Sequence, residues 1–271
     1  MTLEDRTSIP VSSIPLVMGI VNVTPDSFSD GGRFLRADDA VAHGLELLAE
    51  GASILDIGGE STRPGASPVT IDEEIARVVP VVEALAAHGR VSVDTRRPEV
   101  ARAAVAAGAT LINDVSASLW PVAAELGVGW VAMHMQGEPA TMQLDPTYTD
   151  VVAEVCAFLE QRATEAATAG VAEIWIDPGF GFGKTLEHNL TLLAHLDRLV
   201  ALGWPVVVGT SRKATLGRIL ADSDGVADPV DPQDRLAGSI ATEVWAMHRG
   251  AAMIRAHDVR AAVQAAKVVA A

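Results

Sequence analysis

Ser53-Ile54-Leu55-Asp56-Ile57-Gly58-Gly59-Glu60-Ser61-Thr62-Arg63-Pro64-Gly65 joins an apolar run to an acidic residue and then to a glycine-rich polar loop. A buried strand is normally apolar, so an acid that closes one is expected where water or a ligand can reach it. A glycine-rich loop that carries one arginine suits the capture of an anion. The segment therefore predicts a strand whose end contributes to a functional site.

The same pattern, an apolar run followed by a polar tip, recurs along the chain. The predicted strands are Leu16 to Val21, Ser53 to Ile57, Arg90 to Asp94, Thr110 to Asp114, Val128 to His134, Glu173 to Asp177, Pro205 to Gly209 and Ala252 to His257. Alanine- and leucine-rich segments with helical spacing lie between them, including Asp38 to Gly51, Ile71 to Gly89, Pro98 to Gly108 and Asp150 to Gly170. Continuous apolar strands that alternate with helices indicate a parallel sheet covered on both faces.

Eight strand–helix units in 271 residues predict a (β/α)8 barrel, whose usual length is about 250 residues. A doubly wound open sheet is the alternative, but no Gly-x-Gly-x-x-Gly turn follows the first strand. We expect one domain over residues 1–271, with residues 1–15 as an N-terminal extension. The polar stretch 221–235 is predicted to be a loop, in which Asp231-Pro232 caps the following helix.

Composition narrows the possible partners and compartments. The net charge is −15 and no Lys/Arg run occurs, which disfavours nucleic-acid binding. No apolar run reaches about 18 residues, so no membrane span is expected. The single cysteine, Cys156, excludes an intramolecular disulfide and suits a reducing compartment, so a cytoplasmic location is expected. Cys156 lies in an apolar helical stretch and is interpreted as a core residue.

In a (β/α)8 barrel the active site lies at the carboxyl ends of the strands. The residues at these predicted ends are polar almost throughout: Asn22, Asp56, Asp94, Asn113-Asp114, His134, Asp177, Ser211-Arg212-Lys213, Arg255 and His257-Asp258. One such residue is commonly a loop cap, but eight on one face indicate an active site. Asp94, Asn113 and Asp177 suit a flat heterocycle with several N–H groups. Arg63, Lys213, Arg255 and His257 suit phosphate or carboxylate.

Asn22 with Asp26 offers oxygen ligands to a hard cation such as Mg²⁺, which completes its coordination with water and substrate phosphate. No Cys/His cluster suggests zinc. The stretch from Asp177 to Thr185 resembles a P-loop, but that motif requires glycine where Pro178 stands. We interpret it as a turn whose glycines let the backbone approach a ligand, with Phe182 as an apolar wall.

Taken together, these residues resemble the dihydropteroate synthase family from about residue 16 to 268. The motifs that carry the resemblance are residues 18–32, 56–65, Ser92 to Arg96, Ile112 to Ser116, Met133 to Gly137, Asp177 to Lys184, Ser211 to Lys213 and Ile254 to Asp258. The family joins 4-aminobenzoate to the methylene carbon of 6-hydroxymethyl-7,8-dihydropterin diphosphate and releases diphosphate, in folate synthesis. The resemblance implies a (β/α)8 barrel, assistance by Mg²⁺ and a homodimer.

The resemblance also implies roles for single residues. The pterin would be held by Asp94, Asn113, Met133, Asp177, Phe182, Gly209 and Lys213, and the diphosphate by Asn22, Arg63, Arg255 and His257. The aminobenzoate site would be bordered by Thr62, Arg63, Pro64 and Ser211, and the metal by Asn22 and Asp26. Asp94, Arg63 and Lys213 would be the catalytic residues. Loops 24–32 and 61–67 would be lids. Compared with the other strand ends, Asp56 is interpreted as an orienting residue at the pocket floor.

Two positions depart from the family pattern. Ala117-Ser118 stand where the family usually has two glycines, and Thr215 stands where it usually has an aromatic residue. Neither removes a named ligand, so they bear on loop shape and aminobenzoate affinity. Two alternative functions remain at this point. One is a non-catalytic or divergent pterin-binding paralogue, and the other is a pterin-dependent methyltransferase, which would not need residues 24–32 or Arg63.

Overall fold

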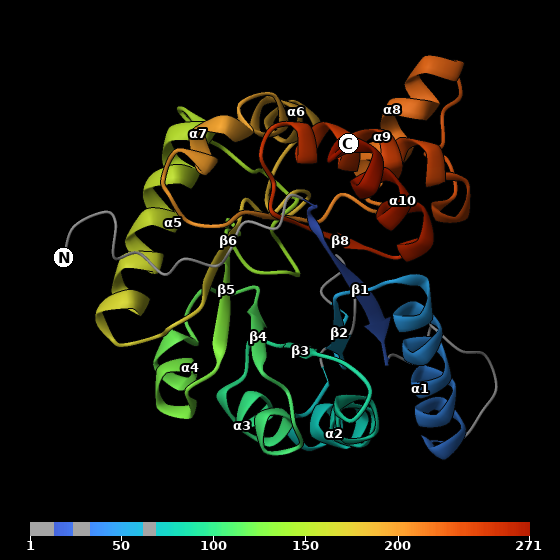
Figure 1. The fold of residues 1–271 in the computed structure, drawn as a ribbon. Helices are drawn as coiled ribbons and strands as arrows, with labels where there is room; N and C mark the ends of the chain where they lie inside the picture. Colours follow the sequence, from blue (N-terminus) through green and yellow to red (C-terminus); the bar gives the residue numbers. More distant parts are fainter. Residues whose placement is uncertain (1–13, 24–32, 62–68) are drawn as a thin grey trace.

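A computed structural model describes residues 14–23, 33–61 and 69–271, in which parallel strands alternate with helices (Figure 1). The strands are β1 (Leu16–Asn22), β2 (Ile54–Gly58), β3 (Val91–Asp94), β4 (Leu111–Asp114), β5 (Gly129–Met133), β6 (Ile174–Asp177), β7 (Val207–Val208) and β8 (Met253–Ala256). The helices are α1 (Arg33–Glu50), α2 (Ile71–Ala86), α3 (Pro98–Ala106), α4 (Trp120–Leu126), α5 (Val151–Thr168), α6 (Leu186–Ala194), α7 (Leu196–Val200), α8 (Ala214–Asp224), α9 (Leu236–His248) and α10 (Val259–Val269), with a 3₁₀ helix, η3, at Pro232–Asp234. Every predicted strand is present.

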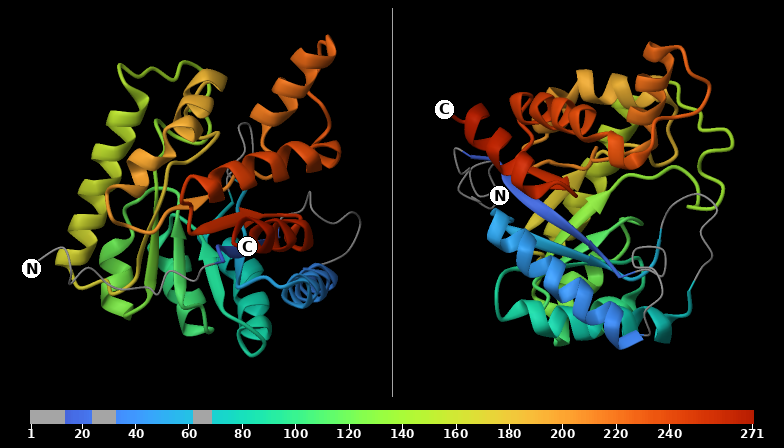
Figure 2. Two further views of the ribbon diagram at one scale, coloured as in Figure 1. Left: turned by 45° about the horizontal axis from the view of Figure 1, so that its top comes forward. Right: turned by 90° about the vertical axis from the view of Figure 1, so that its right-hand side faces the viewer.

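The strands form one sheet in the order β6-β5-β4-β3-β2-β1-β8-β7, and all the pairings are parallel. The two edges meet through a bridge between Ile176 and Val206, where the Ile176 N–H donates to the Pro205 carbonyl at 3.0 Å. The helices lie outside the strands (Figure 2). The predicted (β/α)8 barrel is therefore confirmed, and the open-sheet alternative is wrong.

Side chains of one strand face fill the barrel interior. Its apolar cluster takes one residue from each of seven strands: Met18, Ile54, Leu111, Val131, Trp175, Val207 and Met253. Because successive side chains of a strand point to opposite faces, the residues two positions further along face the same interior. A much larger cluster fills the space between strands and helices.

The next interior layer lies two residues further toward the carboxyl ends of the strands, and most of its side chains are polar or charged. Its members are Ile20, Asp56, Asp94, Asn113, Met133, Asp177, Gly209 and Arg255. The apolar interior layer is thus followed by a polar layer at the carboxyl ends of the strands, which we call the barrel mouth and where a (β/α)8 barrel has its active site. The period of two also separates these residues from neighbours such as Asp114 and His134, which lie on the opposite strand face.

Two boundaries differ from the sequence interpretation. The predicted loop 221–235 begins too early, because α8 continues to Asp224 and ends at Gly225, which has a left-handed φ of 69°. Asp231 does cap a helix, but that helix is the short η3, where its side chain accepts from the Gln233 N–H. Figures 1 and 2 show α8 projecting away from the barrel. Within the described ranges, no helix combines the length and apolarity needed to cross a bilayer.

Candidate active site

The centre of the barrel mouth is a network around Arg255. Its Nε donates to Asp56 Oδ2 at 2.7 Å, and its Nη2 donates to Asp94 Oδ2 at 2.8 Å. The same Asp56 oxygen accepts from Asn113 Nδ2 at 2.8 Å. Asp56 is fully buried, so its charge is balanced by these donors. Asp56 therefore orients Arg255 and Asn113, as expected from the sequence.

Burial raises the pKa of Asp94 to about 7, and the neighbouring Asp56 carboxylate adds to the rise while Arg255 and Lys213 oppose it. Burial also raises the pKa of Asp177, against the hydrogen bond from the Gly179 N–H, which it accepts at 2.7 Å, and the charge of Lys213. Lys213 therefore lies close enough to both carboxylates to influence them. Perturbed carboxyl groups gathered in a barrel mouth are typical of active sites.

An apolar wall stands beside these carboxylates. The Lys213 ammonium lies 4.0 Å from the centroid of the Phe182 ring, within the range of a cation–π contact. Met133 is buried beneath the turn at Gly179, and Gly209 lies against Arg255. The structure thus brings together the whole set predicted for the pterin: Asp94, Asn113, Met133, Asp177, Phe182, Gly209 and Lys213.

On the β7–β8 side of the mouth, Ser211 and His257 contact each other. The Ser211 hydroxyl accepts from the His257 backbone N–H at 3.1 Å and lies 3.1 Å from Nδ1 of its ring. Burial lowers the pKa of His257 to about 3, and the charges of Arg255 and Arg212 lower it further. Both effects favour the neutral imidazole, whose ring nitrogen contacts the Ser211 hydroxyl. The interpretation of His257 as a cationic donor to phosphate or carboxylate stays a prediction, because a bound anion would favour the charged imidazole.

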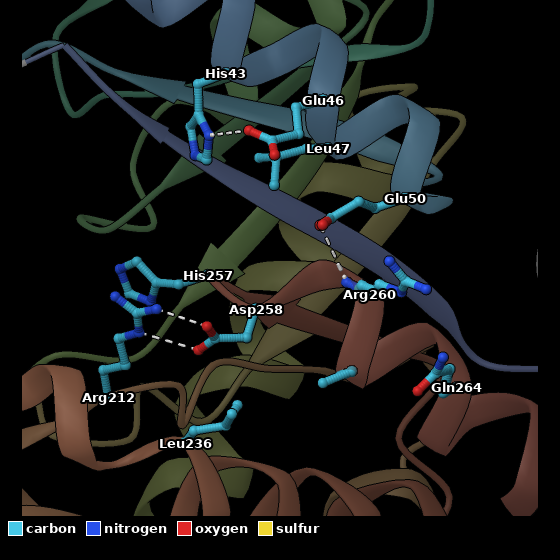
Figure 3. A pocket seen from close by; sticks show the side chains of 11 residues that line it. His43, Glu46, Leu47, Glu50, Arg212, Leu236, His257, Asp258, Arg260 and Gln264 are labelled. Carbon is cyan, nitrogen blue, oxygen red and sulfur yellow. Dashed lines mark hydrogen bonds and ion pairs between the residues drawn. The ribbon is translucent and has the colours of Figure 1, made fainter.

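A groove of about 390 Å³ opens beside Ser211 and His257. Figure 3 shows its walls: side chains of α1 face Arg212, His257 and Asp258 and the first turns of α10. The Arg212 guanidinium makes two hydrogen bonds to Asp258, at 3.0 and 2.6 Å, and the Arg260 N–H donates to Glu50. Asp94, Asp177 and Arg255 do not line it. The groove therefore includes His257, which is predicted to bind the diphosphate, but not the two carboxylates predicted to bind the pterin.

Two glycines of the turn from Asp177 to Thr185 allow close contact with another backbone segment. A Cβ on Gly179 would lie 1.9 Å from the His134 carbonyl oxygen, and one on Gly183 would lie 2.2 Å from that of Gln136. Both glycines have positive φ, 66° and 58°. The turn therefore packs its backbone against the segment after β5. The prediction that the turn also lets the backbone approach a ligand stays a prediction.

Lys184, the lysine of the P-loop-like stretch, is buried within the same turn. Its Nζ contacts His134 Nδ1 at 2.9 Å and donates to the carbonyls of Phe182, Gly179 and His134. Burial lowers the pKa of Lys184 to about 7 and that of His134 to about 3. Lys184 ties two loops together, which supports the rejection of a nucleotide-binding P-loop.

A second network, largely missed from the sequence, joins Glu60, just after β2, to α2 and to the segment after β3. Glu60 and Glu74 both accept from the Arg97 guanidinium at 2.8 Å, and Glu60 also accepts from the Val69 N–H at 3.4 Å and from Arg96 at 3.3 Å. Glu60 and Val69 flank residues 62–68. No sequence signal joined Arg97 or Glu74 to Glu60, because their contacts depend on how α2 and the segment after β3 meet.

Some predicted site residues are not placed. Asp26, Thr62, Arg63 and Pro64 lie outside the described residues, as do loop 24–32 and most of loop 61–67. Asn22 is described: it ends β1, partly exposed, beside Gly58 in the sheet register.

The two departures from the family pattern have local explanations. Ala117 has a φ of 49°, in the left-handed region that favours glycine. Asp114 holds this turn by accepting from the N–H groups of Ser116, Ser118 and Leu119, so the strand-end Asp114 is a loop cap. Thr215 accepts from the Asn189 amide at 3.4 Å and so contacts the region of α6.

Comparison with known proteins follows from this geometry. A family model described as "Pterin binding enzyme" matches residues 18–257. The dihydropteroate synthase of Mycobacterium leprae is 50% identical over 262 residues, covering 93% of this chain and 92% of its own. The structure of Xanthomonas albilineans dihydropteroate synthase with 4-aminobenzoic acid has a TM-score of 0.86 at 51% identity, covering 94% and 92% of the two chains. The same enzyme in complex with 7,8-dihydropteroate has a TM-score of 0.82 at 48% identity, covering 99% and 94%.

Proposed function

Because the chain belongs to the dihydropteroate synthase family of pterin-binding enzymes, we propose that the polar layer at the barrel mouth carries out its chemistry. The chain is a transferase of folate biosynthesis: it condenses 6-hydroxymethyl-7,8-dihydropterin diphosphate with 4-aminobenzoate to give 7,8-dihydropteroate and diphosphate. One observation supports the assignment of residues most directly. Asp94, Asn113 and Asp177 share one interior layer, and the charge of Lys213 acts on both carboxylates.

The pterin binds in this layer through fixed hydrogen bonds. Asn113 Nδ2 is held by Asp56, so its amide oxygen is oriented as an acceptor for a ring N–H. Asp177 offers a buried carboxylate that the Gly179 N–H orients. Phe182 and Met133 supply the apolar surface that a flat heterocycle requires. Lys213, placed over Phe182, donates to a ring acceptor.

Bond cleavage transfers negative charge to the departing diphosphate and leaves positive charge on the pterin methylene carbon. Arg255 and His257, with Asn22 and Arg63, receive the diphosphate oxygens. Two carboxylates fix the Arg255 guanidinium before substrate binds, so little reorganisation is needed as the charge develops. The Asp94 carboxylate offsets the positive charge on the methylene.

We propose that Mg²⁺ binds at Asn22 and Asp26. Among the described residues, no group of three or more His, Cys, Asp or Glu side chains could hold a metal ion. Asn22 contributes a hard oxygen at the end of β1 and fits a Mg²⁺ that keeps most of its ligands as water and substrate phosphate. When bound, Mg²⁺ supplies positive charge to the leaving diphosphate.

The aminobenzoate binds beside Ser211, with Thr62, Arg63 and Pro64. Its amine is a weak but neutral nucleophile that needs orientation more than a strong base, because the proton can leave after the bond forms. The Ser211 hydroxyl is itself positioned by His257, so the aminobenzoate and diphosphate sites share a contact.

A turnover assay tests this function. Purified protein is mixed with the pterin diphosphate, 4-aminobenzoate and Mg²⁺, and the release of diphosphate and the formation of dihydropteroate are measured. We expect equal amounts of both products. Pterin binding by calorimetry without turnover would instead indicate a non-catalytic paralogue. Methyl transfer from a folate to a corrinoid would indicate the methyltransferase.

We further propose a homodimer formed through α6 and α9. Trp245 is 49% exposed on α9 and Leu190 is 43% exposed on α6. The Trp245 indole donates to the Leu193 carbonyl at 3.1 Å, so both residues belong to one rigid face. Sedimentation equilibrium should give a dimer, and Trp245→Lys should give a monomer. A cytoplasmic location, which suits the lone Cys156, is tested by cell fractionation.

A further inference from the structure

Arg212, at the centre of the Ser211-Arg212-Lys213 motif, has an unusual backbone conformation. Its φ is 56°, in the left-handed region that non-glycine residues rarely occupy. Ala117 is the other non-glycine residue with positive φ in the described ranges. A strained conformation of this kind persists when the surrounding structure holds it, and such positions cluster at functional sites. The neighbours that hold Arg212 are therefore of interest.

Ser239 of α9 and Arg235, the residue that precedes this helix, hold both backbone polar groups of Arg212. The Arg212 N–H donates to Ser239 Oγ at 2.9 Å, and the Arg212 carbonyl accepts from Arg235 Nη1 at 2.9 Å. Ser239 in turn donates to the Arg235 carbonyl at 2.8 Å, so the two groups form one unit. Thr242, one turn further along, contacts the hydroxyl of Thr210 at 2.9 Å. We call Arg235 and Ser239 the α9 clamp.

The clamp is built into the core. Arg235 is 7% exposed, and its Nε donates to the Val230 carbonyl at 2.6 Å. Space for its guanidinium comes from Gly217 of α8, where a Cβ would lie 2.5 Å from Arg235 Nε. Ser239 is fully buried. The Arg212 side chain is fixed separately by its two hydrogen bonds to Asp258, as Figure 3 shows.

The left-handed turn at Arg212 separates the side chains on either side of it. Ser211 contacts His257 on the diphosphate side. Lys213 lies over Phe182 and acts on Asp94 and Asp177, on the pterin side. A right-handed conformation at Arg212 would redirect the chain, so these two contacts could not both form.

We propose that Arg235 and Ser239 are positioning residues of the reaction, because their clamp holds Arg212 in the conformation that places Ser211 and Lys213 in the site. The proposal rests on the proposed roles of Ser211 and Lys213. The clamp acts through the backbone of Arg212.

A double-mutant cycle tests the proposal. Glycine adopts positive φ readily, so Arg212→Gly should make the clamp less necessary. We expect Ser239→Ala to lower kcat/KM at least tenfold in the natural chain and less than threefold in the Arg212→Gly background. Equal losses in both backgrounds would overturn the proposal. Ser223→Ala, an exposed serine on α8, is the matched control and should leave kcat/KM unchanged.

A readout independent of turnover separates this proposal from the residue roles on which it rests. The ring nitrogen signals of His257, observed by NMR, report its contact with Ser211. Ser239→Ala should shift these signals in the natural chain and much less in Arg212→Gly. An unshifted His257 signal in Ser239→Ala would refute the clamp. If Ser211→Ala and Lys213→Ala kept full activity while the His257 signals behaved as expected, the clamp would stand and the proposed roles would fail.

Discussion

Arg255 and Asp56 lie 199 positions apart in the chain and meet across the barrel mouth, with Arg255 Nε 2.7 Å from Asp56 Oδ2. The contact joins β8 to β2 across β1, and Asp94 extends it to β3. Asp56 is fully buried, and its Oδ1 has no hydrogen-bond partner within the described ranges. The hydrogen bonds of the Asp56 side chain in the described residues are therefore those it accepts from Arg255 and Asn113.

Asp56→Ala should destabilise the protein and the site together. It removes one partner of a buried ion pair and leaves the Asn113 amide and part of the Arg255 guanidinium unpaired. Such a loss costs about 3–5 kcal/mol. Chemical denaturation should show the loss, and calorimetry should show weaker pterin binding. Arg102→Ala, which breaks an exposed bidentate pair with Glu125, should leave both measurements nearly unchanged. Equal effects of the two substitutions would contradict the role assigned to Asp56.

The pH dependence of kcat/KM should follow Asp94. Burial first, and then Asp56, raise its pKa to about 7. The carboxylate is the form that we propose offsets the methylene charge. Activity should therefore rise with pH and level off above about 7, falling about tenfold per pH unit below about 6. Steady-state rates from pH 5 to 9 check this. Asp94→Asn should lower activity and flatten the profile. His257, whose pKa is about 3, cannot produce a step near 7.

Glu243 should make stability fall as pH rises. It is 1% exposed on α9, its Oε2 has no partner in the described part of the chain, and burial raises its pKa to about 8. The unfolded carboxyl ionises near 4.5, so the folded state binds an additional proton between pH 4.5 and 8. The stability that protonated Glu243 contributes to the folded state is fully present below pH 4.5 and is lost as pH rises to about 8.

Glu243→Gln should remove this loss. At pH 9 the variant should be more stable than the natural chain by on the order of 5 kcal/mol, and at pH 4.5 the difference should be small. Denaturant unfolding at the two pH values measures it. A difference that is independent of pH would contradict the assignment to Glu243.

Gly179→Ala should distort the pterin side of the site, whereas Gly127→Ala should not. The two glycines have φ values of 66° and 67°, so both substitutions carry the same backbone strain. Only at Gly179 would the new Cβ meet an atom, the His134 oxygen at 1.9 Å, because Gly127 has nothing within 4 Å. Gly127→Ala should cost about 1–2 kcal/mol. Thermal unfolding and pterin calorimetry should show a larger loss for Gly179→Ala.

Arg63→Ala and Asp177→Ala should separate turnover from pterin binding. Arg63 is predicted to meet the diphosphate and aminobenzoate, so its loss should slow turnover strongly and spare the binding of a pterin without diphosphate. Asp177→Ala should abolish that binding, because a buried acceptor for the ring is lost. Calorimetry and turnover assays of both variants check this. If Arg63→Ala turned over at the wild-type rate, the loop that carries Arg63 would have a structural role and not a catalytic one.

The interior layer could be predicted because strand periodicity is local. Asp94, Asn113, Asp177 and Arg255 each stand two residues beyond an inward-facing position, and the barrel brings them together. The same reasoning could not separate Asn113 from Asp114 without knowing which residue faces inward.

The remaining features depend on contacts between distant segments. Glu60 meets Arg97, and Lys184 meets His134, through the packing of loops whose paths the sequence does not specify. The glycines at 179 and 183 indicated that the backbone approaches another group closely, but not that this group is the backbone after β5. The end of α8 was misplaced because Asp222, Ser223 and Asp224 favour loops, although Gly225 gives the helix its terminus.

The join between β6 and β7 gives ligand binding a second effect. In the part of the chain that the structure describes, these strands are joined by an isolated bridge at Ile176 and Val206, while the other neighbouring strands share ladders of two to five residue pairs. Asp177 stands on one side of this seam and Gly209 on the other. A pterin bound by both, as proposed, would span the weakest closure of the barrel, so its binding energy would also oppose local opening there. The bound substrate should therefore stabilise the β6–β7 region against local unfolding, and amide exchange at Ile176 and Val207 should slow when it binds.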